Sequence, residues 1–318
     1  MDDFNLEKKF KMSPVFTVLI GLLYRCQCNC VHCAVADYSK SGKELTTAEV
    51  IKLMNQLPDV LKKSTKEKKI HVQFTGGEPL LRKDLLILIK YAHQRSFEPQ
   101  LNTNGLLLTE TMVKKLKKAG LKKVAVSIDS SNDRIHDAAR GVKGCFKSAI
   151  IGMKNCLRGG IKCCIGTCAN NKSVNNGELE KIILLGKKIG VDYIRIIPSV
   201  LAGKWQDKGQ GLNKNNLWHL EKLKDSYKDF VMFEGNLCGA YRKKSITISP
   251  YGDVLACPYI PITFGNIREE SLTDILSRMF LHPIFKTKIR TGECFGNNQK
   301  IRKRYFKTKR PKGSLIRL

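Results

Sequence analysis

Residues 24–33 read Tyr24-Arg25-Cys26-Gln27-Cys28-Asn29-Cys30-Val31-His32-Cys33, which places four thiols within eight positions. Thiolates are soft ligands that select zinc, copper(I) or iron–sulfur clusters. The spacing Cys26-x3-Cys30-x2-Cys33 supplies three ligands, whereas a structural zinc site is closed by four. Three thiolates on a four-iron cluster leave one iron without a protein ligand. The pattern therefore predicts an iron–sulfur site open to a further molecule, and Cys28, inside the loop, is not expected to be a ligand.

A second motif, Gly76-Gly77-Glu78-Pro79, follows a predicted strand. The two motifs together resemble the radical S-adenosylmethionine (SAM) superfamily. The resemblance implies a [4Fe-4S] cluster on the catalytic cysteines Cys26, Cys30 and Cys33, whose open iron binds SAM. It also implies reductive cleavage of SAM to a 5′-deoxyadenosyl radical, with the protein binding and orienting the reactants. A fortuitous cysteine cluster or a zinc site is the alternative.

Length and composition indicate a globular protein. The 318 residues, 42% of them hydrophobic, suit one large α/β domain with a small appendage. No apolar run of about 18 residues exists, and the polar lead-in over residues 1–14 lacks the pattern of a signal peptide. We therefore expect a cytoplasmic protein with no membrane partner. The twelve cysteines indicate reduced thiols and metal, because disulfide scaffolds are short and loop-rich.

The formal net charge is +29, which could attract nucleic acid or a polycarboxylate. Lysines are spread over the predicted helices, as in Lys114-Lys115 and Lys117-Lys118, and no nucleic-acid module is recognisable. We therefore expect solvated helix faces and no nucleic-acid partner. The densest basic block, Arg302 to Lys312, predicts a disordered tail within residues 299–318.

Strand and helix patterns alternate through the first 200 residues. Predicted strands cover residues 15–20, 70–74, a short run ending at 101, 123–129, 161–168 and 193–197. Predicted helices begin at the Thr46-x-x-Glu49 capping box and then cover residues 81–91, 111–120, 144–157 and 178–189. Six alternations imply a parallel sheet covered by helices. The resemblance implies a partial (β/α)6 TIM-like barrel over residues 15–200.

Functional residues gather at the C-terminal ends of strands in such sheets. That rule selects the cysteine loop and residues 76–79, 102–105, 127–129 and 168–170. The resemblance implies that the backbone of the Gly-Gly-Glu-Pro motif holds the SAM amino group and that polar groups after strands four and five hold its ribose and carboxylate. The predicted SAM-binding residues are His32, Gly76, Gly77, Glu78, Pro79, Asn104, Ser127 and Asp129.

Three of these positions have alternatives. Ser127 and Asp129 could cap a helix or form a turn. His32 occupies a position that is usually aromatic in the family and packs on adenine, and its protonation would add pH sensitivity. Cys168, at the functional end of strand five, is expected to be a packing residue, with hydrogen-atom donation to a substrate radical as the alternative.

The alternation stops at Pro198, and a Gly-rich polar stretch over residues 202–211 places a domain boundary near residue 200. A helix over residues 214–230 is predicted, followed by a β-hairpin around Pro250-Tyr251-Gly252-Asp253. Gly252-x4-Cys257, with Phe264-Gly265-Asn266-Ile267 after it, resembles the SPASM and twitch extensions of radical SAM enzymes. The resemblance implies a small α+β domain over residues 201–298 that holds an auxiliary cluster.

The implied auxiliary ligands are Cys238, Cys257 and Cys294. A full SPASM domain supplies cysteines for two clusters, so the twitch form with one auxiliary [4Fe-4S] cluster is expected. A zinc site that adds His282 is the alternative.

The function expected first is maturation of a ribosomally made peptide. A small-molecule precursor in tetrapyrrole or other cofactor biosynthesis is the second possibility, because a basic cleft would suit carboxylates. A zinc-ribbon nucleic-acid binder is the alternative of another class. The enzyme would need an electron donor such as flavodoxin or ferredoxin. Only about 14 residues precede the first strand, so no leader-binding domain is expected.

Overall fold

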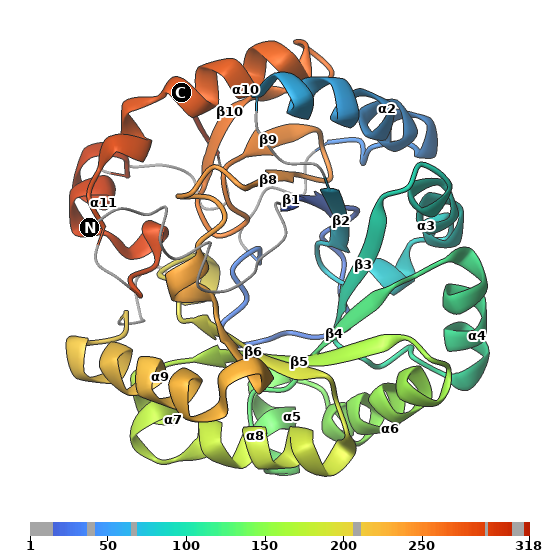
Figure 1. The fold of residues 1–318 in the computed structure, drawn as a ribbon, viewed down its shortest axis with the longest axis vertical. Coiled ribbons are helices and arrows are strands. Elements are labelled where there is room, and N and C mark those ends of the chain that lie inside the picture. The colour runs from blue at the N-terminus through green and yellow to red at the C-terminus, as the bar shows by residue number, and fades with distance from the viewer. Residues whose placement is uncertain (1–14, 37–41, 65–68, 206–210, 290–291, 307–314) are drawn as a thin grey trace.

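The computed structural model describes residues 15–36, 42–64, 69–205, 211–289, 292–306 and 315–318, so the lead-in over residues 1–14 lies outside it. Within these residues, eleven strands form one sheet in the order β11-β10-β9-β8-β1-β2-β3-β4-β5-β6-β7. The sheet curves through the middle of the molecule and helices surround it (Figure 1). None of the described helices is both long enough and apolar enough to cross a membrane.

Six parallel strands form the predicted partial barrel. They are β1 (Val15–Gly21), β2 (Lys69–Thr75), β3 (Glu98–Thr103), β4 (Lys123–Ser127), β5 (Lys162–Ala169) and β6 (Tyr193–Pro198). The predicted helices that cover them are α2 (Thr47–Ser64), α3 (Leu85–Gln94), α4 (Glu110–Ala119), α6 (Cys145–Arg158) and α8 (Glu178–Ile189). Two short helices were not predicted, α5 (Asp133–Arg140) and α7 (Asn171–Asn175).

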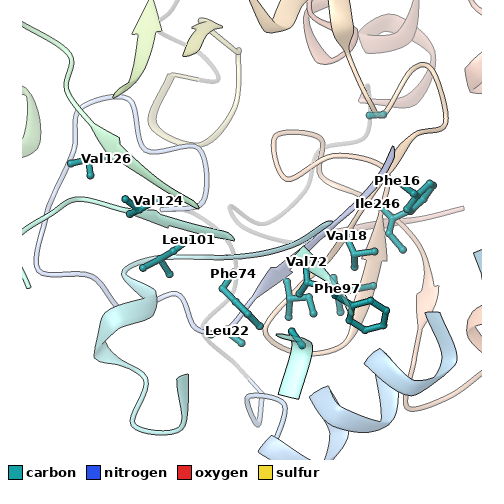
Figure 2. Packing of buried hydrophobic residues seen from close by; sticks show 14 of the residues in the cluster. Phe16, Val18, Leu22, Val72, Phe74, Phe97, Leu101, Val124, Val126 and Ile246 are labelled. Carbon is teal, nitrogen blue, oxygen red and sulfur yellow. The ribbon is translucent and has the colours of Figure 1, made fainter. Parts of the chain in front are cut away.

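The core lies between the barrel strands and their helices. Burial alternates along β1, so that one face packs outward and the other faces the barrel interior. Figure 2 shows the outward side chains of neighbouring strands packed together, among them Val18, Val72 and Leu101. Helix α2 contributes Val50 and Leu57 to the same core, at the spacing of one helix face.

Local signals explain where the helices begin. The capping box before α2 is present, because Glu49 N–H donates to Thr46 Oγ1 and Thr46 N–H donates to Glu49 Oε2. The helix predicted from Leu81 instead begins at Leu85. The residues before it form a 3₁₀ turn, η1 (Pro79–Leu81), in which the N–H of Leu80 donates to the side chain of Glu78.

The C-terminal third extends the same sheet at both edges. After α9 (Lys214–Tyr227), β7 (Val231–Phe233) pairs with β6 in parallel. The predicted hairpin forms from β8 (Ser245–Ile248) and β9 (Asp253–Leu255), and β8 pairs in parallel with β1. Strands on both sides of residue 200 therefore belong to one sheet.

The outermost elements are β10 (Ile262–Asn266), β11 (Ile316–Arg317), α10 (Leu272–Leu281) and α11 (Gln299–Tyr305). The prediction of a disordered tail is wrong for the start of the basic block, because α11 contains Arg302, Lys303 and Arg304. The side chain of Asn298 caps this helix, and Ile301 is fully buried beneath it. Residues 307–312 of that block lie outside the described residues.

Candidate active site

The cysteine loop follows β1 and is fixed to the end of α5. Asn29 N–H donates to the Arg140 carbonyl and Val31 N–H donates to the Ala139 carbonyl, each over 2.9 Å. Two backbone hydrogen bonds two residues apart give this part of the loop a defined register against α5. The loop therefore presents its sulfurs from a scaffold made of strand, loop and helix, although α5 was not predicted.

Arg140 and Asp129 form a buried ion pair beside Cys30. Arg140 Nη2 lies 2.6 Å from Asp129 Oδ2, and Arg140 Nη1 donates to Cys30 Sγ over 3.6 Å. Asp129 Oδ1 accepts the N–H of Cys168 over 3.1 Å. Burial opposes ionisation of Asp129, but Arg140 and His32 outweigh it and hold its pKa at about 2. The predicted SAM-binding carboxylate is therefore ionised and joins β4, β5 and α5.

The sulfurs of Cys26 and Cys30 are in surroundings that favour thiolates. The Cys28 side chain hydrogen-bonds to both sulfurs and is the largest cause of their low pKa values, about 6 for Cys26 and about 5 for Cys30, against the opposing effect of burial. Asn104 Nδ2 also donates to Cys26 Sγ over 3.7 Å. Burial is the main cause that raises the pKa of Cys33. Thiolates are the form that binds metal.

The glycine pair packs against the backbone that leads into the cysteine loop. A Cβ on Gly77 would lie 2.2 Å from the Arg25 carbonyl oxygen, and a Cβ on Gly76 would lie 2.3 Å from that of Leu23. Gly76 also has a φ of +127°, which disfavours any other residue. The close approach expected at these glycines is therefore already made by the chain itself.

Glu78 joins the turn after β2 to the turn after β3. Its side chain is fully buried and accepts hydrogen bonds from Thr103 Oγ1 and Asn104 N, each over 2.8 Å, and from Leu80 N over 3.1 Å. Burial raises its pKa to about 7, although these hydrogen bonds oppose the shift. Glu78 thus holds Asn104 in place beside Cys26, and Pro79 begins the 3₁₀ turn that follows.

The turn η2 (Gly203–Trp205) lies against the other end of the cysteine loop. Lys204 N–H donates to the Cys33 carbonyl over 3.2 Å. The Trp205 ring meets the His32 ring edge to face at 5.8 Å, and His32 Nε2 lies 3.4 Å from Asp129 Oδ2. Ser127 is half-buried at the end of β4, where its strand partner is Gly166.

The second set of cysteines has backbone donors directed at each sulfur. The donors are the N–H groups of Ala240, Tyr241 and Phe295 to Cys238, of Tyr259 to Cys257, and of Gly296 and Asn297 to Cys294. The three thiols also interact electrostatically with one another. Burial raises all three pKa values, that of Cys294 to about 12. Buried sulfurs with N–H donors fit an iron–sulfur cluster, which binds thiolates and is tuned by such hydrogen bonds.

The side chain of His282 makes structural contacts within the C-terminal third. Its Nδ1 accepts the N–H of Ile284 over 3.2 Å, and its ring packs against Phe264 at 5.6 Å and Tyr305 at 5.7 Å. Among the residues that the structure describes, no three His, Cys, Asp or Glu side chains converge to hold a single metal ion. His282 therefore caps the turn after α10 and packs against two aromatic rings.

Cys168 interacts electrostatically with residues of both cysteine sites. Its thiol interacts with Asp129 and Arg140 on one side and with Cys294 on the other, and burial raises its pKa to about 12, so it keeps its proton. Tyr259 interacts with Cys168, with Cys257 and with an ion pair between Arg195 and Glu234, whose Nε and Oε1 atoms are 3.1 Å apart. A substrate between the two cysteine sites would meet these side chains.

Two family models match the chain. The model described as the radical SAM superfamily matches residues 20–186, and the model of an iron–sulfur cluster-binding domain, SPASM, matches residues 238–300.

Solved structures share the fold. Streptococcus suis SuiB bound to precursor peptide SuiA is 17% identical, with a TM-score of 0.65 over 86% of this chain and 67% of that one. Native anSMEcpe with bound AdoMet and Cp18Cys peptide is 16% identical, with a TM-score of 0.65 over 87% of this chain and 84% of that one.

Proposed function

Because the chain belongs to the radical SAM superfamily, we propose that it matures a ribosomally made peptide by hydrogen abstraction. A radical SAM domain binds a [4Fe-4S] cluster and SAM, and a SPASM domain binds auxiliary iron–sulfur clusters. When bound, the cluster and SAM supply a 5′-deoxyadenosyl radical. The side chains described above bind, orient and shield the reactants.

In this proposal Cys26, Cys30 and Cys33 hold the catalytic cluster, and Cys238, Cys257 and Cys294 hold one auxiliary cluster. SAM would lie over the ends of the barrel strands. The residues that meet it would be His32, the backbone of Gly76–Pro79, Asn104, Ser127 and Asp129. Asn104 and Asp129 support this assignment, since one donates to Cys26 and the other is joined to Cys30 through Arg140.

The interactions that link Cys168 and Tyr259 to residues of the two cysteine sites carry the substrate proposal. A substrate beside these side chains would lie between the open iron and the auxiliary cluster. The 5′-deoxyadenosyl radical could then accept a hydrogen atom from it, and the auxiliary cluster could accept an electron. Solved structures of SuiB and anSMEcpe, which share the fold, contain peptides. That supports a peptide substrate.

A tetrapyrrole substrate is less well supported. It would call for cations free to bind carboxylates, but Arg195 at this place is already paired with Glu234. The reductant proposed is an acidic protein such as flavodoxin or ferredoxin, because opposite charge speeds association with a chain of charge +29.

The test is anaerobic incubation of the reconstituted enzyme with SAM, a strong reductant and the small peptides encoded beside its gene. Formation of 5′-deoxyadenosine and methionine is followed by chromatography, and the peptide by mass spectrometry. We expect a mass change in one peptide that depends on Cys30 and is absent from Cys30→Ala. The peptide proposal would be contradicted if the enzyme cleaved SAM, left every such peptide intact and converted a tetrapyrrole instead.

A further inference from the structure

Gly166 lies near the middle of β5 and faces the interior of the barrel. Side chains alternate between the two faces of a strand. Ile165 and Thr167, the residues on either side of Gly166, are buried on the outer face, which the helices α6 and α8 cover (Figure 1). Gly166 is only half-buried. Solvent therefore reaches its backbone from inside the barrel.

Neither packing nor backbone conformation accounts for a glycine at this position. A Cβ on Gly186, in α8, would lie 2.5 Å from Ile194 Cδ1, so that glycine is needed for packing. A Cβ on Gly166 would meet no atom within 4 Å. Among the glycines that the structure describes, Gly144 and Gly190 have the same open surroundings, but their φ angles of +80° and +86° favour glycine. Since a glycine inside a strand weakens it and often marks the close approach of a ligand, Gly166 points to a ligand inside the barrel.

The strand register places Ser127 and Arg195 on either side of Gly166. Residues paired on neighbouring parallel strands point to the same face, so these three residues form one layer inside the barrel. In the layer below, Cys164 and its strand partner Ala125 are both buried. The open space beside Gly166 (the Gly166 space) is therefore closed toward the N-terminal ends of the strands.

The other end of the Gly166 space lies toward the catalytic site. Cys168 faces the same way as Gly166 and is two residues nearer to the end of β5, about 7 Å along the strand. Its N–H donates to Asp129 Oδ1 over 3.1 Å, and Arg140 joins Asp129 to the Cys30 sulfur. A molecule in the Gly166 space therefore lies beneath the place where the open iron and SAM are expected.

An ion pair without net charge lies on the β6 side of the Gly166 space. Arg195 Nε is 3.1 Å from Glu234 Oε1, and the two side chains are 14% and 35% exposed. Among the described residues, the buried Arg195 Nε has no partner in hydrogen-bond geometry. The pair therefore presents N–H donors beside a carboxylate acceptor. Glu234 would repel a second carboxylate and Arg195 an ammonium group, whereas a neutral amide has an acceptor for one and a donor for the other.

We propose that the Gly166 space receives the substrate, and that Gly166, Arg195 and Glu234 select a peptide segment that presents a neutral amide. The absence of a side chain at Gly166 leaves room for the segment, and the ion pair orients its amide. The inference rests on the peptide function proposed above and assigns three specificity-determining residues to it. A residue larger than glycine would exclude the substrate and leave both cysteine sites intact.

The competing explanation is that SAM fills the Gly166 space, because Ser127 in the same layer is a predicted SAM-binding residue. The other predicted contacts of SAM follow β1, β2, β3 and β4. Arg195 and Glu234 instead belong to β6 and η4 (Glu234–Leu237), and η4 leads directly to Cys238 of the second cysteine set. The ion pair therefore lies outside the strands that carry the SAM-binding motifs. Direct measurement of SAM affinity separates the two explanations.

The first measurement needs no substrate. Gly166→Ala should raise the apparent melting temperature of the reconstituted protein by about 1–3 °C, because alanine restricts the unfolded chain and its methyl group meets no atom. Iron content and SAM affinity should stay at wild-type values in Gly166→Ala and in the bulkier Gly166→Val. A lower melting temperature in Gly166→Ala would show that the glycine serves the fold, and weaker SAM binding in either variant would assign the space to SAM. Each result would overturn the proposal.

The second measurement is steady-state conversion of the peptide whose mass changes in the assay described above. We expect the KM for this peptide to rise about threefold in Gly166→Ala and about tenfold or more in Gly166→Val, with a smaller change in kcat, because added methyl groups occupy the space that the substrate needs. Glu234→Gln removes the charge of the acceptor and should raise the KM about tenfold. Thr167→Val, on the opposite face of the same strand, is the matched control and should keep the wild-type KM.

A wild-type KM in Gly166→Val would overturn the proposal. An equal rise in Thr167→Val would also overturn it, because the effect would then belong to the strand. Failure of the peptide function gives a different result, in which the wild-type enzyme converts a tetrapyrrole and no peptide. A raised KM for the tetrapyrrole in Gly166→Val would then support the Gly166 space as the substrate site and overturn the selection of an amide.

Discussion

Arg140 is the residue that ties the catalytic loop to the barrel. Its guanidinium contacts the sulfur of Cys30 and the carboxylate of Asp129, while its backbone carbonyl accepts the N–H of Asn29. One side chain therefore positions a ligand and balances its charge. A lysine would not replace it, because a single ammonium cannot reproduce two directed contacts from a planar fork.

Gly77→Ala tests the close packing at the glycine motif. The added methyl group would lie 2.2 Å from the Arg25 carbonyl oxygen and 2.7 Å from that of Tyr24, just before Cys26. We expect the loop to shift and iron at the catalytic site to fall together with SAM affinity. Iron analysis and SAM binding measure both. Gly166→Ala is the control for iron content, because a Cβ there meets nothing within 4 Å. Full iron content with weakened SAM binding in Gly77→Ala would instead mean that Gly77 is needed for SAM binding and not for the packing of the cysteine loop.

Single functional residues could be predicted where a short motif or the end of a predicted strand marks them. Cys26, Cys30 and Cys33 stand out by spacing, and strand ends pointed to Asn104 and Asp129. Arg140, Lys204 and Trp205 were missed because their contacts arise from distant segments: α5 meets the loop through Asn29, and Lys204 meets it through Cys33. No local pattern marks such a contact.

Among the elements, those with their own capping and periodicity were the predictable ones. Helix α2 has its Thr46–Glu49 box, and the side chain of Ser271 caps α10. Strand β7 has three residues, too few for an alternating apolar pattern to be recognised in the sequence. It forms by pairing with the edge of β6. The basic run in α11 resembles a tail by charge, yet the buried Ile301 anchors it as a helix.

An ion pair joins α2 to the C-terminal strands, and Arg268→Ala or Glu49→Gln tests it. Arg268 Nε and Nη2 lie 2.5 and 2.9 Å from the two carboxylate oxygens of Glu49, and Arg268 is the largest cause that lowers the pKa of Glu49 to about 2. The two side chains are 33% and 32% exposed, so solvent screens the pair and we expect each change to lower the free energy of unfolding by roughly 0.5–1 kcal/mol at pH 7.

The pH dependence of that loss follows from the sign of the shift. The folded pKa of Glu49 is below its unfolded value of about 4.5, so the stabilisation is complete above that pH and is lost as pH falls toward 2. The difference in melting temperature between wild type and Glu49→Gln should therefore narrow between pH 5 and pH 3. Glu110→Gln, which breaks an exposed pair with Lys114 within α4, is the control and should change stability less. A difference that stays constant with pH would assign the effect to packing.

For the whole molecule, the continuous sheet predicts that residues 1–200 do not form a soluble core by themselves. Without β8, the edge of β1 from Thr17 to Ile20 would expose unpaired backbone groups, which favour aggregation. Expression of this fragment should give insoluble protein, as judged by centrifugation and size exclusion. The full chain with Cys238→Ala and Cys257→Ala keeps β8 and should stay soluble. A monomeric fragment holding about four irons would show that the barrel is independent.

Iron content tests the two cysteine sites together. On four-iron stoichiometry, the reconstituted chain should bind about eight irons, and replacing Cys26, Cys30 and Cys33 by alanine should leave about four. Replacing Cys238 and Cys257 should remove the other four and impair substrate turnover while SAM still binds. Zinc in a colourless triple variant would contradict the auxiliary cluster.

The pairing of β8 with β1 also means that β1 is synthesised long before the strand that pairs with its edge. Ile20 meets Ile248, which leaves the ribosome about 230 residues later, or roughly 10–45 s at 5–20 residues per second. Throughout that interval a strand rich in β-branched residues, with the reactive thiols directly after it, has one edge without its final partner. Such a nascent chain is a natural client for a chaperone, and slower translation of the C-terminal third would lengthen its exposure.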